Sequence, residues 1–417
     1  MNKELKNIEK IREKFIQNRI KEFGDIELKK ESKENLDFIK QNLRSLEGVS
    51  FTGIGDGLFY GGRSIGCSEC IKGQGCTIVI SYLCNRSCFF CYEKNPLCPE
   101  NSFNAATNQK DYNKSLRIID DTFSTNKNNK TLAITGGEPF LHKKTVFKIL
   151  DYVNEKYSGV IKRIYTTGDF IDEEILKKLK DKGVSELRYS IKPYEKPKTE
   201  LYKLSKKYIP SVLIEMPVQP DTYEYMYKIM KELSDQNAIN GFNLNEMTYN
   251  GHHNTIYNKL NYKIDLQKGE LVEKYYGISK KEYPILGSKL TSLKLIHDII
   301  KNEKPTYYIH FCSIETVQKH NFIRRKELAE KFKTPTSETT PLGFHKILVI
   351  YKNINNAIKL FKKNNIYNFK IIYNNGHPEK IETHPNNAKF ISKSLFESYL
   401  IFKDPKNRFG LNYKKML

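Results

Sequence analysis

The spacing of hydrophobic residues changes along the chain and predicts most of its elements. Apolar residues recur at helical spacing in residues 8–23 and 31–48, where charged residues fill the other positions. From residue 76 onward, short β-branched runs alternate with helical segments. The predicted strands are residues 76–83, 132–137, 160–168, 184–193, 209–220 and 239–247. The predicted helices between them are residues 146–157, 172–183, 200–208 and 222–237.

This repeated strand–helix order predicts an α/β fold with parallel strands joined by right-handed crossovers. A doubly wound sheet and a β/α barrel, full or partial, both satisfy the order. A glycine-rich loop at residues 53–67 comes before it, and residues 250–300 are less periodic. Residues 305–313 then read as a strand and residues 314–332 as a basic helix.

A cluster of Pro, Thr and Ser at residues 334–343 predicts a linker. The strand, helix and strand expected at residues 345–352, 356–364 and 368–376 would form a small α/β appendage beyond it. We therefore expect an N-terminal helical segment (1–60), a cysteine-containing segment (61–75), a core (76–260), an extension containing Cys312 (261–335) and a small basic domain (345–417).

Composition limits the class of protein. Hydrophobic residues make up 39% of 417 residues, with 27 Tyr and 23 Phe, which is enough for a core and argues against global disorder. No run of 18 apolar residues exists, and the charged N-terminus lacks a secretory signal, so we expect a cytoplasmic protein with no membrane partner. Eight cysteines in a reducing compartment then indicate metal binding or catalysis rather than disulfides.

The net charge of +22 is concentrated near the C-terminus. Residues 345–417 hold 14 Lys and Arg against 4 Asp and Glu, whereas the first 48 residues hold 12 against 10. A basic C-terminal domain is able to contact RNA or an acidic peptide. A composition rich in Lys and Asn produces the same excess without any partner, and no base-contact motif is present. Both interpretations stay open.

Cys84, Cys88 and Cys91 follow the pattern C-x3-C-x2-C directly after the first predicted core strand. Three thiolates this close can hold one face of a cuboidal [4Fe–4S] cluster, for which sulfur is the preferred ligand. One iron then lacks a protein donor and can bind a cofactor or substrate, as a catalytic zinc does through its open position. The alternative is a structural zinc site, for which the third cysteine is less usual.

A second group of cysteines precedes the first core strand with the pattern C-x2-C-x5-C. We consider a second iron–sulfur cluster, a structural zinc or unligated thiols for this group. The candidate donors are Cys67, Cys70 and Cys76, with Cys312, Cys98 or His310 as the fourth.

Two motifs together resemble the radical SAM superfamily. One is the cysteine triplet, with aromatic residues on both sides of Cys91; the other is "GGEP" at residues 136–139, which ends the second predicted strand. The resemblance implies a partial (β/α)6-type barrel with a [4Fe–4S] cluster whose open iron chelates S-adenosylmethionine. Reductive cleavage of that cofactor would give a 5′-deoxyadenosyl radical that abstracts hydrogen from a substrate. A reductant such as flavodoxin or ferredoxin would supply the electron.

The same resemblance implies a set of cofactor-binding residues at the ends of the core strands. Paired glycines let the backbone approach a ligand closely, and polar side chains at the carboxyl ends of barrel strands line active sites. No residue is assigned as a catalytic acid, base or nucleophile. The implied residues are Phe90, Tyr92, Gly136, Gly137, Glu138, Pro139, Thr167, Ser190 and Asn245.

Across residues 66–312 the chain resembles a poorly characterised branch related to the pyruvate formate-lyase activating enzyme. That resemblance favours Cys67, Cys70 and Cys312 as one site and leaves Cys76 open; Tyr92 stands where the branch often has proline. Our first hypothesis is a radical SAM enzyme acting on a peptide or protein. The second is an enzyme acting on RNA or a nucleotide. The third is a non-catalytic iron–sulfur or zinc module that binds nucleic acid, which would require "GGEP" to be a coincidence.

Overall fold

The computed structural model describes residues 25–53, 56–91, 109–125, 130–249, 253–265, 283–340, 343–391, 396–403 and 412–416. The described residues up to His320 form one compact unit, and those from Asn321 onward form a second. The second unit begins within helix α13 (Ile314–Lys331), ahead of the segment where the sequence predicts a linker. The helix predicted at residues 8–23 lies outside the described residues.

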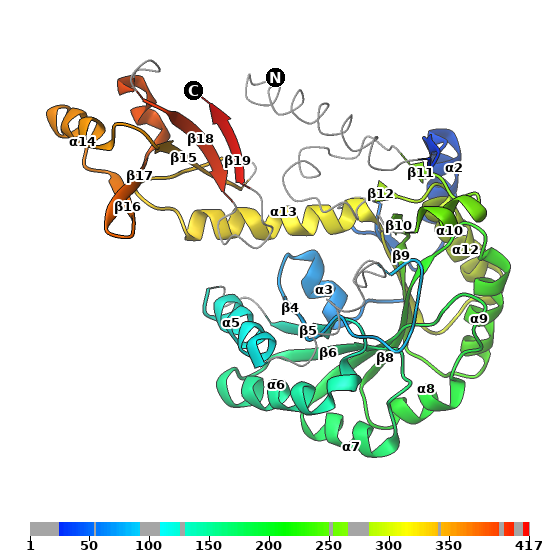
Figure 1. Ribbon diagram of the computed structural model, residues 1–417. Helices are drawn as coiled ribbons and strands as arrows, with labels where there is room; N and C mark the ends of the chain where they lie inside the picture. Colours follow the sequence, from blue (N-terminus) through cyan, green and yellow to red (C-terminus); the bar gives the residue numbers. More distant parts are fainter. Residues whose placement is uncertain are drawn as a thin grey trace. The chain divides into compact units, whose positions relative to one another are not determined.

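One curved, nine-stranded sheet forms the centre of the first unit (Figure 1). Every strand pair from β4 through β9 to β13 is parallel, and β2 and β3 extend the sheet antiparallel to β13. In spatial order the strands are β2 (Val49–Phe51), β3 (Leu58–Tyr60), β13 (Tyr308–Cys312), β9 (Gly241–Glu246), β8 (Ser211–Val218), β7 (Val184–Tyr189), β6 (Ile161–Thr166), β5 (Thr131–Thr135) and β4 (Cys76–Val79).

The order of these strands decides between the two folds that the sequence allowed. Strands β4 to β9 follow one another in space as they do in sequence, whereas a doubly wound sheet reverses direction at a switch point. Strands β2 and β4 are the two edges, so the barrel is partial. The expected partial (β/α)6 barrel is confirmed.

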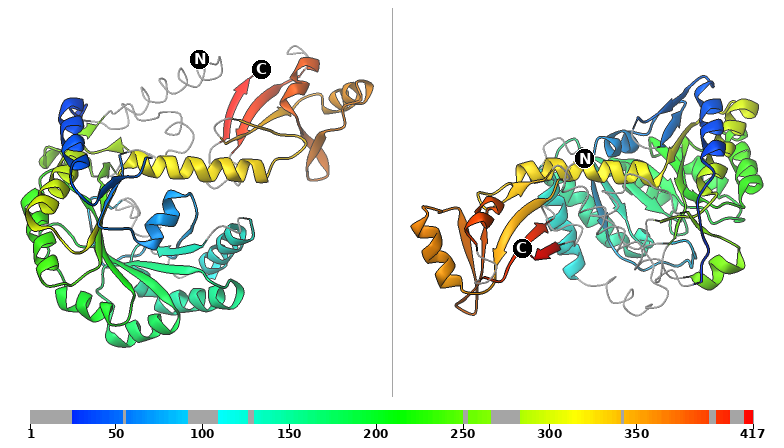
Figure 2. Two further views of the ribbon diagram at one scale, coloured as in Figure 1. Left: turned by 180° about the vertical axis from the view of Figure 1, so that it is seen from behind. Right: turned by 90° about the horizontal axis from the view of Figure 1, so that it is seen from above.

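The helices of the first unit mostly cover the convex face of this sheet, as Figures 1 and 2 show. All four helices predicted between the core strands are present as α6 to α9. The bounds are α2 (Lys33–Arg44), α3 (Ile65–Ile71), α5 (Gln109–Thr125), the 3-10 helix η1 (Pro139–His142), α6 (Lys143–Lys156), α7 (Glu173–Asp181), α8 (Thr199–Lys206), α9 (Tyr223–Asp235), α10 (Asn254–Lys259) and α12 (Ser288–Glu303).

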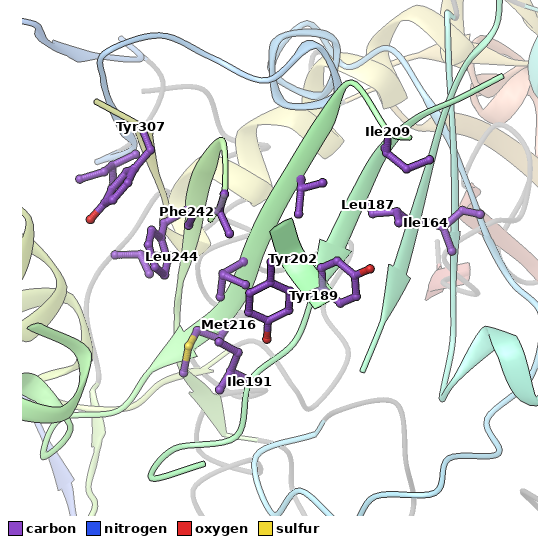
Figure 3. Close-up of a cluster of buried hydrophobic side chains, with 14 of the residues drawn as sticks. Ile164, Leu187, Tyr189, Ile191, Tyr202, Ile209, Met216, Phe242, Leu244 and Tyr307 are labelled. Atoms are coloured by element: carbon purple, nitrogen blue, oxygen red, sulfur yellow. The ribbon is translucent and has the colours of Figure 1, made fainter. Parts of the chain in front are cut away.

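Alternation along the core strands separates an apolar convex face from a polar concave face. Leu187 and Tyr189 on β7 belong to the main hydrophobic cluster, shown in Figure 3 with Tyr202 of α8. Glu186 and Arg188 alternate with them and are buried away from that cluster. The concave face therefore holds the buried charges, and the convex face holds the core.

Helix α3 lies on the concave side of the sheet, within the arc of the strands in both Figure 1 and Figure 2. A Cβ added at Gly66 would lie 2.6 Å from Nη1 of Arg163 on β6. From the sequence we expected a glycine-rich loop that ends at residue 67, and this helix was not predicted. Ser64 caps it by accepting a hydrogen bond from the Cys67 amide at 3.1 Å.

The N-terminal segment 1–60 differs from its expected helical character. Helix α2 confirms the helix predicted at residues 31–48, but β2 and β3 follow it and join the central sheet. Leu58 and Phe59 are buried there. The two short runs VSF and LFY, separated by a glycine-containing turn, form an antiparallel pair, and the second run also pairs with β13.

Two small sheets lie beside this barrel. Strand β1 (Leu28–Lys29) pairs in parallel with β11 (Ile264–Asp265), and β10 (Thr248–Tyr249) pairs antiparallel with β12 (Tyr283–Pro284). Leu28, Tyr249, Ile264 and Tyr283 of these strands pack in a hydrophobic cluster together with neighbouring residues that include Met247, Tyr257 and Tyr262.

The second unit has an antiparallel sheet with its own hydrophobic cluster. The predicted strand, helix and strand are confirmed as β15, α14 and β16. The remaining strands were not predicted; β14, β17 and β19 have largely polar sequences, whereas β18 is mostly apolar. The elements are β14 (Glu338–Thr339), β15 (His345–Ile350), α14 (Ile354–Lys363), β16 (Phe369–Asn374), β17 (His377–Thr383), the 3-10 helix η2 (Pro385–Phe390), β18 (Ser398–Lys403) and β19 (Asn412–Met416).

Among the described helices of both units, none combines the length and the apolar character that a membrane crossing requires.

Candidate functional site

The three cysteines of the C-x3-C-x2-C motif share one loop after β4, at the carboxyl edge of the parallel sheet. The Cys91 amide donates to the Cys88 carbonyl at 3.0 Å, and the Arg86 amide donates to Sγ of Cys84 at 3.4 Å. All three side chains are partly exposed. Burial raises the pKa of Cys88 to about 11; Lys192 opposes this shift, and the thiols of Cys91 and Cys84 reinforce it.

This arrangement fits a cluster held by three thiolates. The thiols are close enough to influence one another's ionisation, and a single loop presents them together. Bound iron would replace the thiol protons and remove the cost of the buried negative charge on Cys88.

Arg86, between the first two cysteines, ties this loop to two neighbouring loops. Its guanidinium binds both oxygens of Asp169 at 2.6 Å, after β6, and Oε2 of Glu195 at 2.5 Å, after β7. Lys198 also pairs with Asp169. The Arg86 hydrogen bonds hold the pKa of Asp169 well below its usual range. The cysteine loop is therefore fixed by a charged tether that sequence reasoning did not identify.

The paired glycines of "GGEP" let the turn after β5 lie directly against the start of the cysteine loop. The Gly137 amide donates to the Ser81 carbonyl at 2.7 Å, and the Glu138 amide donates to the Leu83 carbonyl at 2.8 Å. A Cβ at Gly136 would lie 2.2 Å from the Ser81 oxygen, and one at Gly137 would lie 2.0 Å from the Leu83 oxygen. Only glycine permits this approach.

The Glu138 side chain joins the ends of β5 and β6. It is fully buried. Its carboxylate accepts hydrogen bonds from the Thr166 hydroxyl at 2.9 Å, from the Thr167 amide and hydroxyl at 2.6 and 2.8 Å, and from the Phe140 amide at 3.0 Å. Pro139 begins η1 and is buried. These contacts give the Glu138 carboxylate and the Thr167 hydroxyl structural partners within the protein.

The other expected cofactor-binding residues lie at the same edge or beside it. Ser190 follows β7, is exposed, and donates its amide to the Thr166 carbonyl at 2.9 Å. Asn245, near the end of β9, donates to Oε1 of Glu215 at 3.1 Å. Phe90 packs against the aromatic cluster of the two small sheets, next to Phe89. Tyr92 lies outside the described residues.

A network of buried charges on the concave face was not predicted from the sequence. Arg188 on β7 is 2% exposed and binds Glu186 at 2.5 Å and Glu215 of β8 at 2.6 Å. Its Nη2 also donates to Ser64 at 3.1 Å and to Sγ of Cys67 at 3.2 Å. The sequence signal is the pair of charges two residues apart within an otherwise apolar strand, which places both on one face.

The upstream cysteines approach histidines rather than forming one group of thiols. Sγ of Cys67 lies 3.1 Å from Nδ1 of His310 on β13, and Sγ of Cys70 lies 3.7 Å from Nδ1 of His320 on α13. Burial, chiefly, and nearby Arg188 lower the pKa of His310 to about 3, so its ring is neutral near pH 7. His310 was a candidate from the sequence; His320 was not, because it lies in a basic helical pattern without a motif.

Cys312 and Cys76 have different surroundings. Burial raises the pKa of Cys312, and the neighbouring thiols of Cys70 and Cys67 reinforce the shift, so Cys312 lies near both. Cys76 begins β4 within the main hydrophobic cluster, with its Sγ directed at the Ile118 carbonyl of α5 at 3.9 Å. The structure thus brings Cys67, Cys70 and Cys312 into one region and places Cys76 in the core. Cys98 lies outside the described residues.

Comparison with known families and proteins agrees with this site. A family model described as the radical SAM superfamily matches residues 78–237, which include the cysteine loop and "GGEP". A protein of Methanocaldococcus jannaschii named putative glycyl-radical enzyme activating enzyme MJ0021 is 24% identical over 293 residues, covering 66% of this chain and 70% of its own length. An uncharacterized protein of the same organism, MJ0907, is 32% identical over 128 residues, covering 28% and 41%.

Solved structures give partial likenesses. Native anSMEcpe with bound AdoMet is 16% identical, with a TM-score of 0.32 over 41% of this chain and 50% of that one. The methyltransferase TsrM from Kitasatospora setae, with tryptophan and a cofactor analogue bound, is 10% identical, with a TM-score of 0.34 over 49% and 43%. The chain therefore spans half or less of these structures.

Proposed function

We propose that this chain, which belongs to the radical SAM superfamily of enzymes through its domain at residues 78–237, activates a partner protein by abstracting a hydrogen atom from it. Enzymes of this superfamily use a [4Fe–4S] cluster and S-adenosylmethionine. The observation that carries the proposal is the contact between the cysteine loop and the Gly136–Gly137 turn, because it joins the two motifs of the superfamily at one edge of the sheet.

In this proposal Cys84, Cys88 and Cys91 hold the cluster. When bound, the cluster and S-adenosylmethionine would supply the one-electron, radical-generating chemistry by which a hydrogen atom is abstracted from the substrate. Gly136 and Gly137 let their turn lie against the start of the cysteine loop, so the backbone of this turn would lie beside a bound cofactor. The hydrogen bonds of Arg86 to Asp169 would keep the loop that carries the three thiols oriented for binding the cluster.

The polar residues at the ends of β7 and β9 would contact the rest of the cofactor. Ser190 is exposed at this edge, so its hydroxyl is available to a ligand. The Asn245 carboxamide is held by Glu215, which fixes its orientation. Phe90 directly precedes the last cysteine in the sequence, where its ring would shield the cluster from water.

The substrate class follows from the similarity to the relative named as an activating enzyme, whose target is a protein. A protein substrate, with a glycine backbone position as the site of hydrogen abstraction, is the form of the proposal that this similarity favours. The electron would come from an external one-electron donor such as flavodoxin or ferredoxin, because the reaction consumes one electron for each cofactor cleaved.

Anaerobic reconstitution tests the activity. The tag-free protein, loaded with iron and sulfide, reduced and mixed with S-adenosylmethionine, should form methionine and 5′-deoxyadenosine. A Cys88→Ala variant should form neither, whereas Cys76→Ala, altered outside the loop, should retain the activity. The absence of 5′-deoxyadenosine from a protein that carries the cluster would contradict the proposal.

Deuterium transfer tests the substrate class. Protein and RNA fractions from source cells grown in deuterated medium are supplied separately, and 5′-deoxyadenosine is analysed by mass spectrometry. Deuterium should appear with the protein fraction and disappear after protease treatment. Transfer from the RNA fraction alone would replace the protein substrate with RNA, the hypothesis that the basic C-terminal region raised.

A further inference from the structure

Helix α3 presents two cysteines to two buried histidines. Cys67 and Cys70 are three residues apart, so their side chains share one face of the helix. Their sulfurs lie 3.1 Å from Nδ1 of His310 and 3.7 Å from Nδ1 of His320. Three separate elements, α3, β13 and α13, therefore supply sulfur and nitrogen donors to one region of the concave side.

Among the described residues, neither imidazole has hydrogen-bond partners for both of its ring nitrogens. His310 and His320 are each 3% exposed. The Nε2 atom of each is buried and has no hydrogen-bond partner among the described residues. The His310 ring is held in place by stacking on Phe59, with centroids 4.2 Å apart. Buried polar nitrogens normally have partners, so two such rings beside two thiols indicate a ligand.

The sulfur–nitrogen separations suit a single ion. In a tetrahedral zinc site, with Zn–S near 2.3 Å and Zn–N near 2.05 Å, a sulfur and a nitrogen ligand lie about 3.5 Å apart. The two observed separations, 3.1 and 3.7 Å, lie on either side of this value. In a cuboidal cluster each protein ligand binds a different iron, so its ligands lie farther apart.

We propose that Cys67, Cys70, His310 and His320 bind one zinc ion. Among the described residues no three such side chains are already gathered closely enough to hold a metal ion, so binding requires side-chain rotations that bring the two sulfur–nitrogen pairs together. Arg188 donates a hydrogen bond to Sγ of Cys67 at 3.2 Å, which favours the thiolate that zinc requires.

The site has a structural consequence. It joins α3 to β13, a central strand, and to the part of α13 that belongs to the first unit. Cys312, two residues after His310 on the same face of β13, lies beside the ion in this arrangement. The ion would keep α3 in the concave side of the barrel, where Gly66 lies against Arg163.

Metal analysis of the tag-free chain tests this site independently of cofactor cleavage. The background is the Cys84/Cys88/Cys91→Ala variant, which removes the first cluster. Its zinc content should be about one ion per chain, with little iron or sulfide. Adding Cys70→Ser or His320→Gln should lower the zinc retained after dialysis against a chelator by at least about tenfold.

Two matched substitutions serve as controls. Cys76→Ser changes a cysteine within the core, and His297→Gln changes a histidine that pairs with Asp298; neither should alter the zinc content. Cobalt(II) bound in place of zinc to the background protein should give the absorption of a four-coordinate ion with a thiolate charge-transfer band. This measurement needs no further variant to fold.

Each remaining outcome overturns the inference. About four irons with sulfide in the background variant would mean a second iron–sulfur cluster. No bound metal would leave the cysteines as thiols. Zinc that persists unchanged in both the Cys70→Ser and His320→Gln proteins would belong elsewhere in the chain.

Discussion

At the scale of single residues, the turn after β5 is defined by the absence of side chains. Gly136 has a φ of +139°, and Gly137 lies in the tighter space, against the Leu83 carbonyl. The atoms nearest to a Cβ at Gly137 are backbone atoms of Leu83 and Tyr82, so no side-chain rotation can relieve the overlap. The "GGEP" motif therefore has a packing role in addition to any contact with a cofactor.

We predict that Gly137→Ala destabilises the first unit by at least about 3 kcal/mol, because its methyl group would overlap the Leu83 oxygen, 2.0 Å away. Urea unfolding followed by circular dichroism measures this loss. The control is Gly159→Ala, where φ is +71° and no atom lies within 4 Å of the added Cβ; it should cost about 1 kcal/mol. Equal losses of stability for the two variants would mean that the turn can move away from the Leu83 carbonyl at no energetic cost.

At the scale of elements, three loops at the carboxyl edge of the sheet depend on one side chain. The guanidinium of Arg86 is largely buried, and its two carboxylate partners come from the loops after β6 and β7. A bidentate contact of this kind fixes orientation as well as distance.

We predict that Arg86→Ala lowers both the stability of the first unit and the iron retained at the cysteine loop. The expected loss of stability is about 1–3 kcal/mol near pH 7, because Asp169 and Glu195 lose their partner. Arg117→Ala, an exposed arginine on α5, should change neither quantity. Iron analysis of reconstituted protein and urea unfolding provide the two measurements.

The pH dependence of this difference follows from the lowered pKa of Asp169. A carboxyl group with a lowered folded-state pKa stabilises the protein above its usual pKa near 3.8, and this stabilisation is lost as the pH falls further. The gap between wild type and Arg86→Ala should therefore be full near neutral pH and shrink below about pH 4. A gap that grows toward acid would contradict the assigned pair.

Helices α3 and α12 show why element prediction failed where it did. The buried face of helix α12 includes Ser288, Lys289 and Ser292 besides apolar residues such as Leu293 and Ile296, so the pattern of apolar residues alone does not reveal the helix. Helix α3 has only seven residues, and glycine and cysteine dominate its sequence. Its helical form depends on the Ser64 cap and on the buried charges around it.

At the scale of the whole molecule, the chain has separate hydrophobic cores. The first unit contains the large cluster on the convex face of the sheet, and the second contains a cluster around Leu348 and Phe361. Because the two clusters share no residue, a cavity made in one core should destabilise only the unit that contains it.

We predict that Phe361→Ala destabilises the second unit by about 3–5 kcal/mol and leaves the first unit unchanged. The change removes a fully buried ring that packs against Phe369 at a centroid distance of 5.5 Å. Differential scanning calorimetry should show one transition shifted to lower temperature. Phe242→Ala, in the core of the first unit, should shift the other transition. A single shift shared by both variants would indicate one cooperative unit.

The sequence by itself determined the parallel α/β sheet and its first site. Period-two strands alternating with amphipathic helices specify a parallel sheet, and this pattern is local, so it can be read without knowing any contact. The cysteine triplet and "GGEP" lie at the ends of consecutive strands, and parallel strands bring such ends to one edge. Their meeting at that edge was therefore implied by the order of the elements.

Only the tertiary structure decided the strand order of the sheet, its extension by β3 and β2, and the contents of the concave face. Strand β3 pairs with β13 across about 250 residues and brings β2 into the sheet with it, and the β3–β13 contact is encoded by no local pattern. His320 lies 250 residues from Cys70, in a helix whose sequence carries no motif. In the sequence, Arg188 and Glu186 have the appearance of solvent-exposed charges. In the structure they are buried beside α3 and form an ion pair within the network on the concave face. Chemistry assembled from distant segments depends on packing, which a single sequence does not display.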